Sequence, residues 1–277
     1  MIDIPKSGGT TAKAIYECQG LALANRAGSL PLFGHDHDNY LLAFKPWPDI
    51  SSATYVNVDT TSYEGIDHAA KLRLVPRHAA DIIFTSYPQY AIEHLYSKNH
   101  RGRALLLARH PVERLISKFY YLQVATWERS YRPQWKTMKI SYWARMVNND
   151  NEHMVKKLAG KRMNEEVTEQ DLQLAMRTVK ERFVVGLMHN MEESIHRFNV
   201  ILGIDESTEL SRNCMDQFFG HGVKKTNSNS HPKIKEGSVP WDSLAQANQL
   251  DIRLYNYMVE LFDEQRGLIE SYRGALQ

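Results

Sequence analysis

The sequence predicts an α/β fold of three layers, in which helices flank a central parallel sheet. Apolar runs rich in β-branched and aromatic residues at 53–59, 80–86 and 103–108 read as buried strands, and segments of helical periodicity lie between and after them. With 277 residues and 43% hydrophobic content the chain can bury a substantial core, and α/β domains of this size are often single. We therefore expect one domain over residues 1–277.

The N-terminal elements are a strand and a helix joined by a short turn. Only residues 1–4 precede Pro5, so the first strand is either very short or lacks its N-terminal part. In the second case a membrane anchor or targeting signal could have been lost with it. Helix formers fill residues 11–28, with apolar side chains at helical spacing, so we expect one helix that stops at Gly28.

The C-terminal two thirds of the chain are predicted to be mainly helical. Apolar and charged residues alternate at helical spacing over residues 112–200, and the run FVVGL at 183–187 is the most strand-like interruption. Residues 224–241 are polar and rich in turn formers, which predicts a long loop. A final helix should then occupy residues 241–273.

Composition excludes several classes of protein. The 34 basic residues nearly balance the 32 acidic ones, so no strong overall field would draw the chain to nucleic acid or to a membrane surface. No apolar run approaches the roughly 20 residues of a membrane span, and no signal-peptide pattern is present. Cys18 and Cys214 are too few for a disulfide framework, and the sequence favours two buried thiols over one disulfide.

The stretch IPKSGGTT at residues 4–11 has the composition of an anion-binding turn. If a strand precedes it and a helix follows, the backbone N–H groups of residues 7–11 converge at a helix N-terminus, where free donors and the helix dipole favour an anion. Lys6 adds a full charge. The lysine precedes the glycines, however, which reverses the Walker A order and argues against an ordinary ATP or GTP loop. The alternative is a glycine-rich turn with an exposed lysine.

A second motif, RHPVERLISKFYY at residues 109–121, follows the predicted strand ALLLA. Arg109 should emerge at the carboxyl end of that strand, where open α/β sheets bind ligands, and Ser117 lies about two helical turns further on. A forked guanidinium and a hydroxyl can grip a phosphate from two sides. The alternative for this stretch alone is a solvated helix, with Arg114 and Lys118 outward and Ile116, Phe119 and Tyr120 inward.

Together the two motifs resemble the paired nucleotide-binding signatures of sulfotransferases that use 3′-phosphoadenosine 5′-phosphosulfate (PAPS). The closer likeness is to the carbohydrate branch with the heparan and uronyl 2-O-sulfotransferases. The resemblance implies a P-loop-like fold in which the first motif holds the 5′-phosphosulfate and the second holds the 3′-phosphate. The residues that would take these roles are Lys6, Ser7, Gly8, Gly9, Thr10 and Thr11, and then Arg109 and Ser117.

The likeness carries further expectations. A late loop closes over the nucleotide in related enzymes, which makes Lys224, Lys225 and Asn227 candidates, although a solvated basic loop is the alternative. Weaker matches at 151–161 and 182–198 we assign to packing more than to chemistry. PAPS would be the co-substrate, no metal is expected, and the acceptor would be a carbohydrate. The resemblance also implies a Golgi-lumen enzyme, attached to the membrane only through a segment absent from this sequence.

The general base departs from the family pattern. Related 2-O-sulfotransferases carry a histidine pair just before the second motif, where this chain has Ser86 and Tyr87. We rank His35 first, because Asp36 and Asp38 lie beside it, and Glu17 second. Further base candidates are His37, His94 and Glu113. The residues considered for acceptor binding are Tyr87, Trp127, Arg129, Tyr131, Arg132 and Trp135.

His110 stands where aspartate is common in the family, and a binding role and a structural role are both open. Because the family's histidine pair is absent at its usual position, the alternative function is that of a nucleotide-binding relative without transfer activity. A P-loop kinase for a small molecule is disfavoured by the reversed lysine order.

Overall fold

The computed structural model describes residues 1–48, 53–128, 130–146, 150–220 and 231–276; for residues 275 and 276 it describes the backbone alone. Its strands run largely parallel, as predicted. Their bounds are β1 Ala22–Ala24, β2 Ala43–Phe44, β3 Thr54–Val56, β4 Ile82–Ile83, β5 Ala104–Ala108 and β6 Phe183–Leu187. One sheet has the order β2-β3-β1-β4 and the other pairs β5 with β6.

Ile2 joins the two sheets. It forms parallel bridges to Thr85, two residues after the end of β4, and to Leu106 in β5. The backbone N–H of its neighbour Asp3 donates to the Thr85 carbonyl at 2.8 Å. Ile2 therefore lies between the segment of β4 and β5 through isolated bridges and is not part of a described strand, and among the described strand pairs only that of β2 with β3 is antiparallel.

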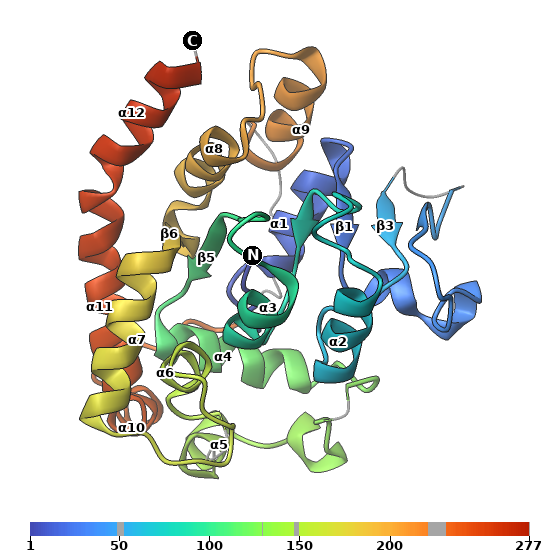
Figure 1. Ribbon diagram of the computed structural model, residues 1–277. Helices are drawn as coiled ribbons and strands as arrows, with labels where there is room; N and C mark the ends of the chain where they lie inside the picture. The colour runs from blue at the N-terminus through green and yellow to red at the C-terminus, as the bar shows by residue number, and fades with distance from the viewer. Residues whose placement is uncertain (49–52, 129, 147–149, 221–230, 277) are drawn as a thin grey trace.

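The helices lie on both faces of these strands (Figure 1). Their bounds are α1 Gly9–Cys18, α2 Tyr63–Lys71, α3 Pro88–Leu95, α4 Pro111–Leu122, α5 Ile140–Met146, α6 His153–Leu158, α7 Glu169–Arg182, α8 Met191–Leu202, α9 Glu209–Phe219, α10 Val239–Gln246, α11 Gln249–Glu264 and α12 Arg266–Leu276. Short 3-10 turns occur at η1 Arg26–Ser29, η2 Pro31–Phe33, η3 Pro133–Lys136 and η4 Met188–Asn190.

The core follows the alternation of side chains along β5. Leu106 packs with residues of α6, α7 and α11, while Leu105 packs with residues of α1 and α8 on the opposite face. Val56 and Ile83 pack against α2 and α3 in a third cluster. Helix layers on both faces of the strands confirm the mixed α/β class.

Two predicted helices are interrupted. The helix expected over 11–28 ends at Cys18, because Gly20 takes a left-handed φ of 79° and β1 then enters the sheet. The final helix divides into α10, α11 and α12. Asn248 at the first break and Gln265 at the second make tertiary hydrogen bonds, the latter to both Phe183 and Val185 at the edge of β6.

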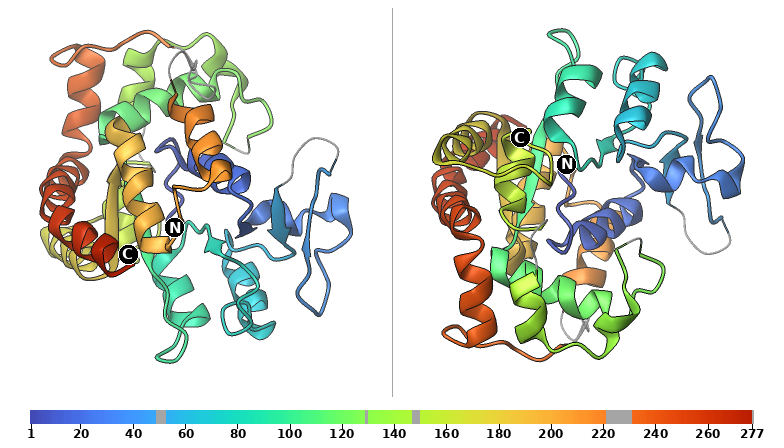
Figure 2. Two further views of the ribbon diagram at one scale, coloured as in Figure 1. Left: turned by 90° about the horizontal axis from the view of Figure 1, so that it is seen from above. Right: turned by 90° about the horizontal axis from the view of Figure 1, so that it is seen from below.

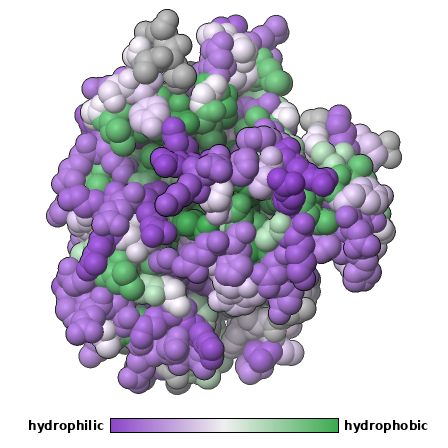
Figure 3. Space-filling view, viewed as in Figure 1, coloured by the Kyte–Doolittle hydropathy of each residue, from purple (hydrophilic) through white to green (hydrophobic). Residues whose placement is uncertain are grey.

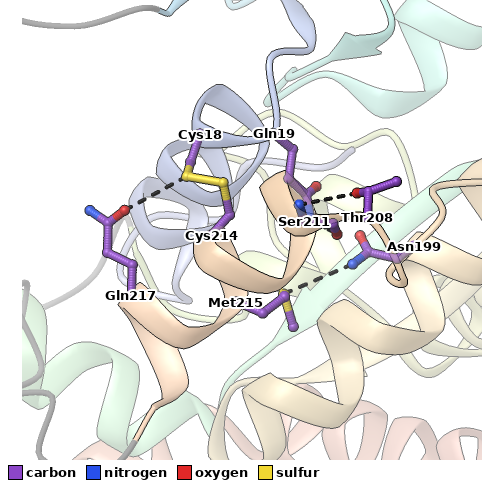
Figure 4. The surroundings of a disulfide bond; sticks show 8 residues. All are labelled: Cys18, Gln19, Asn199, Thr208, Ser211, Cys214, Met215 and Gln217. Carbon is purple, nitrogen blue, oxygen red and sulfur yellow. Dashed lines mark hydrogen bonds between the residues drawn. A yellow bond between two sulfur atoms is a disulfide. The ribbon is translucent and has the colours of Figure 1, made fainter.

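Cys18 and Cys214 form a disulfide, so the prediction of two free thiols was wrong (Figure 4). The bond joins the last residue of α1 to α9 across 196 positions of sequence. Gln19 adds a second link between the same two helices by donating to the hydroxyl of Ser211 at 3.3 Å. The C-terminal end of α1 is thereby held to α9, while its N-terminal end faces the loop of the first motif.

Hydrophilic residues cover most of the face seen in Figure 3. Among the described residues no helix is both long and apolar enough to cross a membrane.

Candidate active site

The loop of the first motif lies between Ile2 and α1, and its backbone is unusual. Lys6 has a φ of 66° and Gly8 a φ of 90°, both in the left-handed region that L side chains rarely adopt. A Cβ at Gly8 would stand 2.9 Å from Leu107, and one at Gly9 would stand 2.5 Å from a carboxylate oxygen of Asp3. Gly8 is therefore favoured by its left-handed backbone, and Gly9 leaves room for the Asp3 carboxylate.

This path leaves hydrogen-bond donors free at the start of α1. The first helical bond of the segment runs from the Ala12 N–H to the Gly8 carbonyl at 3.0 Å, so the N–H groups of residues 9–11 have no carbonyl partner within the helix. Gly8 has no side chain to cap them. The Ser7 hydroxyl oxygen is buried and, within the described part of the chain, has no hydrogen-bond partner. Free donors and the helix dipole converge here, which suits an anion.

Arg109 connects the second motif to this loop. It follows β5 directly, and its Nη1 donates to the backbone carbonyl of Lys6 at 3.0 Å. Its Nε is buried without a hydrogen-bond partner among the described residues, and the nearest carboxylate oxygen, from Glu113, is 3.7 Å away. Burial lowers the pKa of Arg109, which Glu113 partly counters. One arm of the guanidinium thus fixes the loop while the Nε donor remains available.

The ammonium of Lys6 lies over the ring of Tyr121 in α4, 4.1 Å from its centroid. The Tyr121 hydroxyl donates in turn to Glu128 at 2.7 Å. Burial lowers the pKa of Lys6, and the positive charge of Arg109 lowers it further. Tyr121 and Glu128 were missed at the sequence level; the only available signal was that Tyr121 stands four residues after Ser117, on one helical face.

Ser117 and Arg114 lie on the polar face of α4, and their environments differ. Ser117 is 5% exposed, and its hydroxyl makes no hydrogen bond to another described residue. Arg114 is completely buried and paired with Asp150, so the alternative of a solvated helix with Arg114 outward was wrong for this residue. Ile116 and Phe119 pack inward as that alternative had it.

Asp150 is the centre of a charged cluster beside α4. Arg114 donates from Nη1 to its carboxylate at 3.0 Å, Lys118 lies at 3.0 Å, and His153 Nδ1 lies at 3.2 Å. Burial alone would raise the pKa of Asp150, but Arg114, His153 and Lys118 together hold it well below its ordinary value. The carboxylate is therefore ionised and its oxygens are engaged.

A cavity of about 340 Å³ opens between the first loop, the segment after β4, α4 and this cluster; we call it the loop cavity. It is lined by Pro5, Thr61, Ser86, Tyr87, Lys118, Asp150, His153, Lys157 and Met163. Pro5 follows the segment of Ile2, and Ser86 follows the segment of β4, so the cavity lies at the carboxyl edge of parallel segments, where α/β sheets bind ligands. A larger cavity, of about 480 Å³, lies at the opposite edge, where β5 and β6 begin.

The structure does not bring the two predicted bases to the loop. Glu17 accepts a hydrogen bond from the hydroxyl of Tyr55 in β3 and lies eight residues along α1 from Gly9, about 12 Å by helix geometry. His35 contacts Asp38 at 2.9 Å and packs against Phe44 of β2, at the opposite end of the sheet order from the first loop. Figure 2 shows this segment projecting from the body of the molecule.

The remaining sequence candidates are dispersed. Lys224, Lys225, Asn227 and Arg129 lie outside the described residues. His94 is exposed and contacts the carbonyl of Tyr90 at 2.9 Å, and Trp127 is 73% exposed. His110 stacks on Trp241 and meets Tyr255 edge to face, with ring centroids 5.5 and 5.3 Å away, which gives it a packing role.

Comparison with known proteins adds one result. Residues 53–258 match the model of a family described as the sulfotransferase family. The matched segment contains Arg109, Ser117 and every residue of the loop cavity except Pro5. No curated protein and no solved structure matches the chain.

Proposed function

We propose that this chain, which belongs to the sulfotransferase family, moves the sulfuryl group of PAPS to a hydroxyl of a carbohydrate acceptor. The observation that carries the proposal is the hydrogen bond from Arg109 to the carbonyl of Lys6. It joins the two motifs, 103 residues apart in sequence, and so supports a single anion site. PAPS carries a 5′-phosphosulfate and a 3′-phosphate, and each needs its own binding group. The first loop and the arginine at the end of β5 would supply these two groups.

The free donors of the site fit this co-substrate. The open N–H groups at the start of α1 and the buried Ser7 hydroxyl would receive the 5′-phosphosulfate. Arg109 through its unpartnered Nε and Ser117 through its hydroxyl would receive the 3′-phosphate. Buried donors without partners are rare in folded proteins, so several at one place support a missing anionic ligand.

Lys6 would stabilise the charge that develops on the leaving phosphate. Sulfuryl transfer needs a cation at the bridging oxygen as the S–O bond breaks, and a preorganised ammonium in a partly buried site interacts strongly with that oxygen. The ring of Tyr121 and the backbone at a φ of 66° hold Lys6 in place before the substrate arrives. This interaction strengthens in the transition state and so acts on rate more than on affinity.

The carbohydrate acceptor rests on the motif likeness and is supported by the lining of the loop cavity. Tyr87 offers an aromatic surface and Lys157 a cation, with the Lys157 ammonium 4.2 Å from the centroid of the Tyr87 ring. Aromatic faces and charged donors of this kind suit sugars. We further propose that the chain acts as one domain in an oxidising compartment such as the Golgi lumen, which the disulfide between Cys18 and Cys214 supports.

Calorimetric titration with 3′-phosphoadenosine 5′-phosphate (PAP), alongside ATP, tests the donor site. We expect micromolar binding of PAP, none of ATP, and a loss of about 10- to 100-fold in PAP affinity in Arg109→Ala, since hydrogen bonds to charged groups contribute about 1.5–3 kcal/mol. Arg253→Ala is the matched control, because Arg253 is an exposed arginine paired with Glu169. Absence of PAP binding by a folded protein, or equal affinity for ATP, would contradict the proposal.

A second candidate is a nucleotide-binding member of the family without transfer activity. It is favoured by the distance of both predicted bases, Glu17 and His35, from the loop. A sulfate-transfer assay with labelled PAPS separates the candidates, because a binding protein would take up PAP yet leave the label on the nucleotide. A P-loop kinase, in contrast, would show itself in the ATP titration.

A further inference from the structure

The loop cavity contains one side chain with a free lone pair suited to accepting a proton. Thr61 and Ser86 already donate from their hydroxyls to Asp59 and to the Asp3 carbonyl, at 2.6 and 3.2 Å. Burial raises the pKa of Tyr87, so its phenol keeps its proton. These groups bind or orient a ligand but are poor bases.

The charged residues of the cavity are also excluded. Asp150 is surrounded by cations and held ionised by them, which makes its oxygens weakly basic. Lys118 is paired with that carboxylate, and Lys157 lies over the Tyr87 ring as a cation. An ammonium has no lone pair to accept a proton.

His153 differs from all of these. It begins α6, is 5% exposed, and directs Nδ1 to Asp150 at 3.2 Å, which places the ring proton on Nδ1 and the lone pair on Nε2. Nε2 is buried and has no hydrogen-bond partner in the described part of the chain. A buried acceptor left unpaired costs free energy, which indicates a group that enters the cavity with the substrate.

The loop cavity borders the residues that surround Lys6, and His153 lines it. Pro5, which precedes Lys6, lines the cavity. Lys118 also lines it and stands three residues before Tyr121, the ring that holds the Lys6 ammonium, so both lie on one face of α4. A sulfuryl group beside Lys6 would therefore border this cavity.

We propose that His153 is the general base of the transfer and that Asp150 positions it; this proposal rests on the proposed function. The acceptor hydroxyl gives its proton to Nε2 as its oxygen forms a bond to sulfur. The bond between sulfur and the bridging oxygen of PAPS breaks, and its electron pair stays with the 5′-phosphate of PAP beside Lys6. Burial, Arg114 and Lys157 disfavour the imidazolium that results and Asp150 partly counters them, so the ring returns its proton to solvent after product release. Contact with buried Nε2 requires the cavity lining to shift, and the flexible side chain of Met163 is part of that lining.

The test compares His153→Asn with the wild type in single-turnover assays with saturating labelled PAPS. Asparagine keeps a donor toward Asp150 but has no base at the position of Nε2. The acceptors are chemically desulfated heparin and, as a second readout that needs no sugar, water. We expect the rate constant to fall about 100- to 10,000-fold with heparin, as for the loss of a general base, while PAP affinity changes less than about threefold. Added imidazole should restore part of the rate in His153→Ala.

His196→Asn is the matched control, because His196 also pairs with a carboxylate, Glu206 at 2.8 Å, but lies on α8 and does not line the loop cavity. Its rate should match that of the wild type. A His153→Asn protein that binds PAP and transfers at the wild-type rate would overturn the proposal, as would an equal loss in His35→Asn or Glu17→Gln. A wild-type protein that binds PAP but transfers to neither acceptor would overturn it too, whereas failure to bind PAP would instead reject the donor site.

Discussion

Two groups of buried polar side chains differ in whether their hydrogen bonds are complete. At the junction of α6 and α11, Asp251 accepts from the N–H groups of Met154 and Val155, and Glu152 accepts from that of Leu250. Asp251 of α11 thus caps the start of α6, and Glu152, which precedes α6, caps the start of α11. Asn248 accepts from the N–H of Glu152 and donates to the carbonyl of Leu244. This junction is polar, buried and satisfied.

The loop region is equally buried and lacks partners. Ser7 Oγ, Arg109 Nε and His153 Nε2 have no hydrogen bonds among the described residues. Both regions pack against the same sheet, so burial alone does not distinguish stability from function. Buried atoms without partners also occur at Tyr16, Gln19 and Asn199, so it is their clustering around the first loop, together with the free N–H groups there, that supports a ligand site.

The largest expected effect concerns Lys6 and separates rate from stability. Lys6→Ala should lower the single-turnover rate about 1,000-fold, because a cation that meets developing charge acts in the transition state, while the Kd for PAP rises only a few fold. Lys6→Gly is the companion variant, since glycine adopts the φ of 66° without strain. Equal losses in rate and in affinity would remove the proposed role, and recovery in the glycine variant would assign the effect to the backbone.

At the satisfied junction the effect should appear in stability instead. Asp251→Ala leaves two buried N–H groups without acceptors, so we expect the free energy of unfolding to fall by about 3 kcal/mol in urea denaturation. The Kd for PAP at a temperature where the variant is folded should be unchanged. Weaker binding of PAP with normal stability would show that the junction belongs to the site, and would contradict the distinction between the two regions.

Acid pH should reveal His153 in the stability curve. Burial lowers its pKa to about 4, with Arg114 and Lys157 acting in the same direction and Asp150 opposing them. The unfolded chain therefore takes up the proton first, so this histidine makes the free energy of unfolding fall as the pH drops from about 6.5 to 4 and leaves it unchanged above 6.5. Between pH 6.5 and 4 the free energy of unfolding should fall by up to about 3 kcal/mol less in His153→Asn than in the wild type, as measured by urea denaturation at each pH. An identical pH dependence in the variant would mean that His153 titrates normally.

The smallest expected effect on stability is that of Ser7→Ala. The Ser7 hydroxyl has no partner to lose, so the free energy of unfolding should stay within about 0.5 kcal/mol of the wild type or increase slightly. PAP affinity should weaken by about three- to tenfold, measured by the same calorimetry. Asn248→Ala gives the contrast, with clear destabilisation and unchanged affinity. A destabilised Ser7→Ala protein would contradict the distinction between the two regions.

Local sequence was enough to predict several of the strands and the loop of the first motif, but not β1, which lies inside the helix expected over 11–28. The strand runs at 53–59, 80–86 and 103–108 contain β3, β4 and β5, because buried parallel strands need apolar residues on both faces. The motif at 4–11 predicted a loop ahead of a helix, because turn geometry and helix N-termini depend on neighbouring residues. Both motifs could therefore be identified from the sequence. The hydrogen bond from Arg109 to Lys6 follows because the segments that precede them end at a common edge.

The disulfide, the satisfied junction and the Asp150–His153 pair were decided by tertiary structure. Cys18 and Cys214 meet only because α9 packs beside α1, and no spacing in the sequence encodes that contact. His35 has acidic neighbours in sequence yet lies at the far end of the sheet. His153 belongs to the segment 151–161, whose sequence indicated packing, yet it lines the loop cavity. The chain itself determines which residues can bind an anion locally, but whether a histidine faces a cavity depends on long-range packing, since burial and missing partners are properties of the folded molecule.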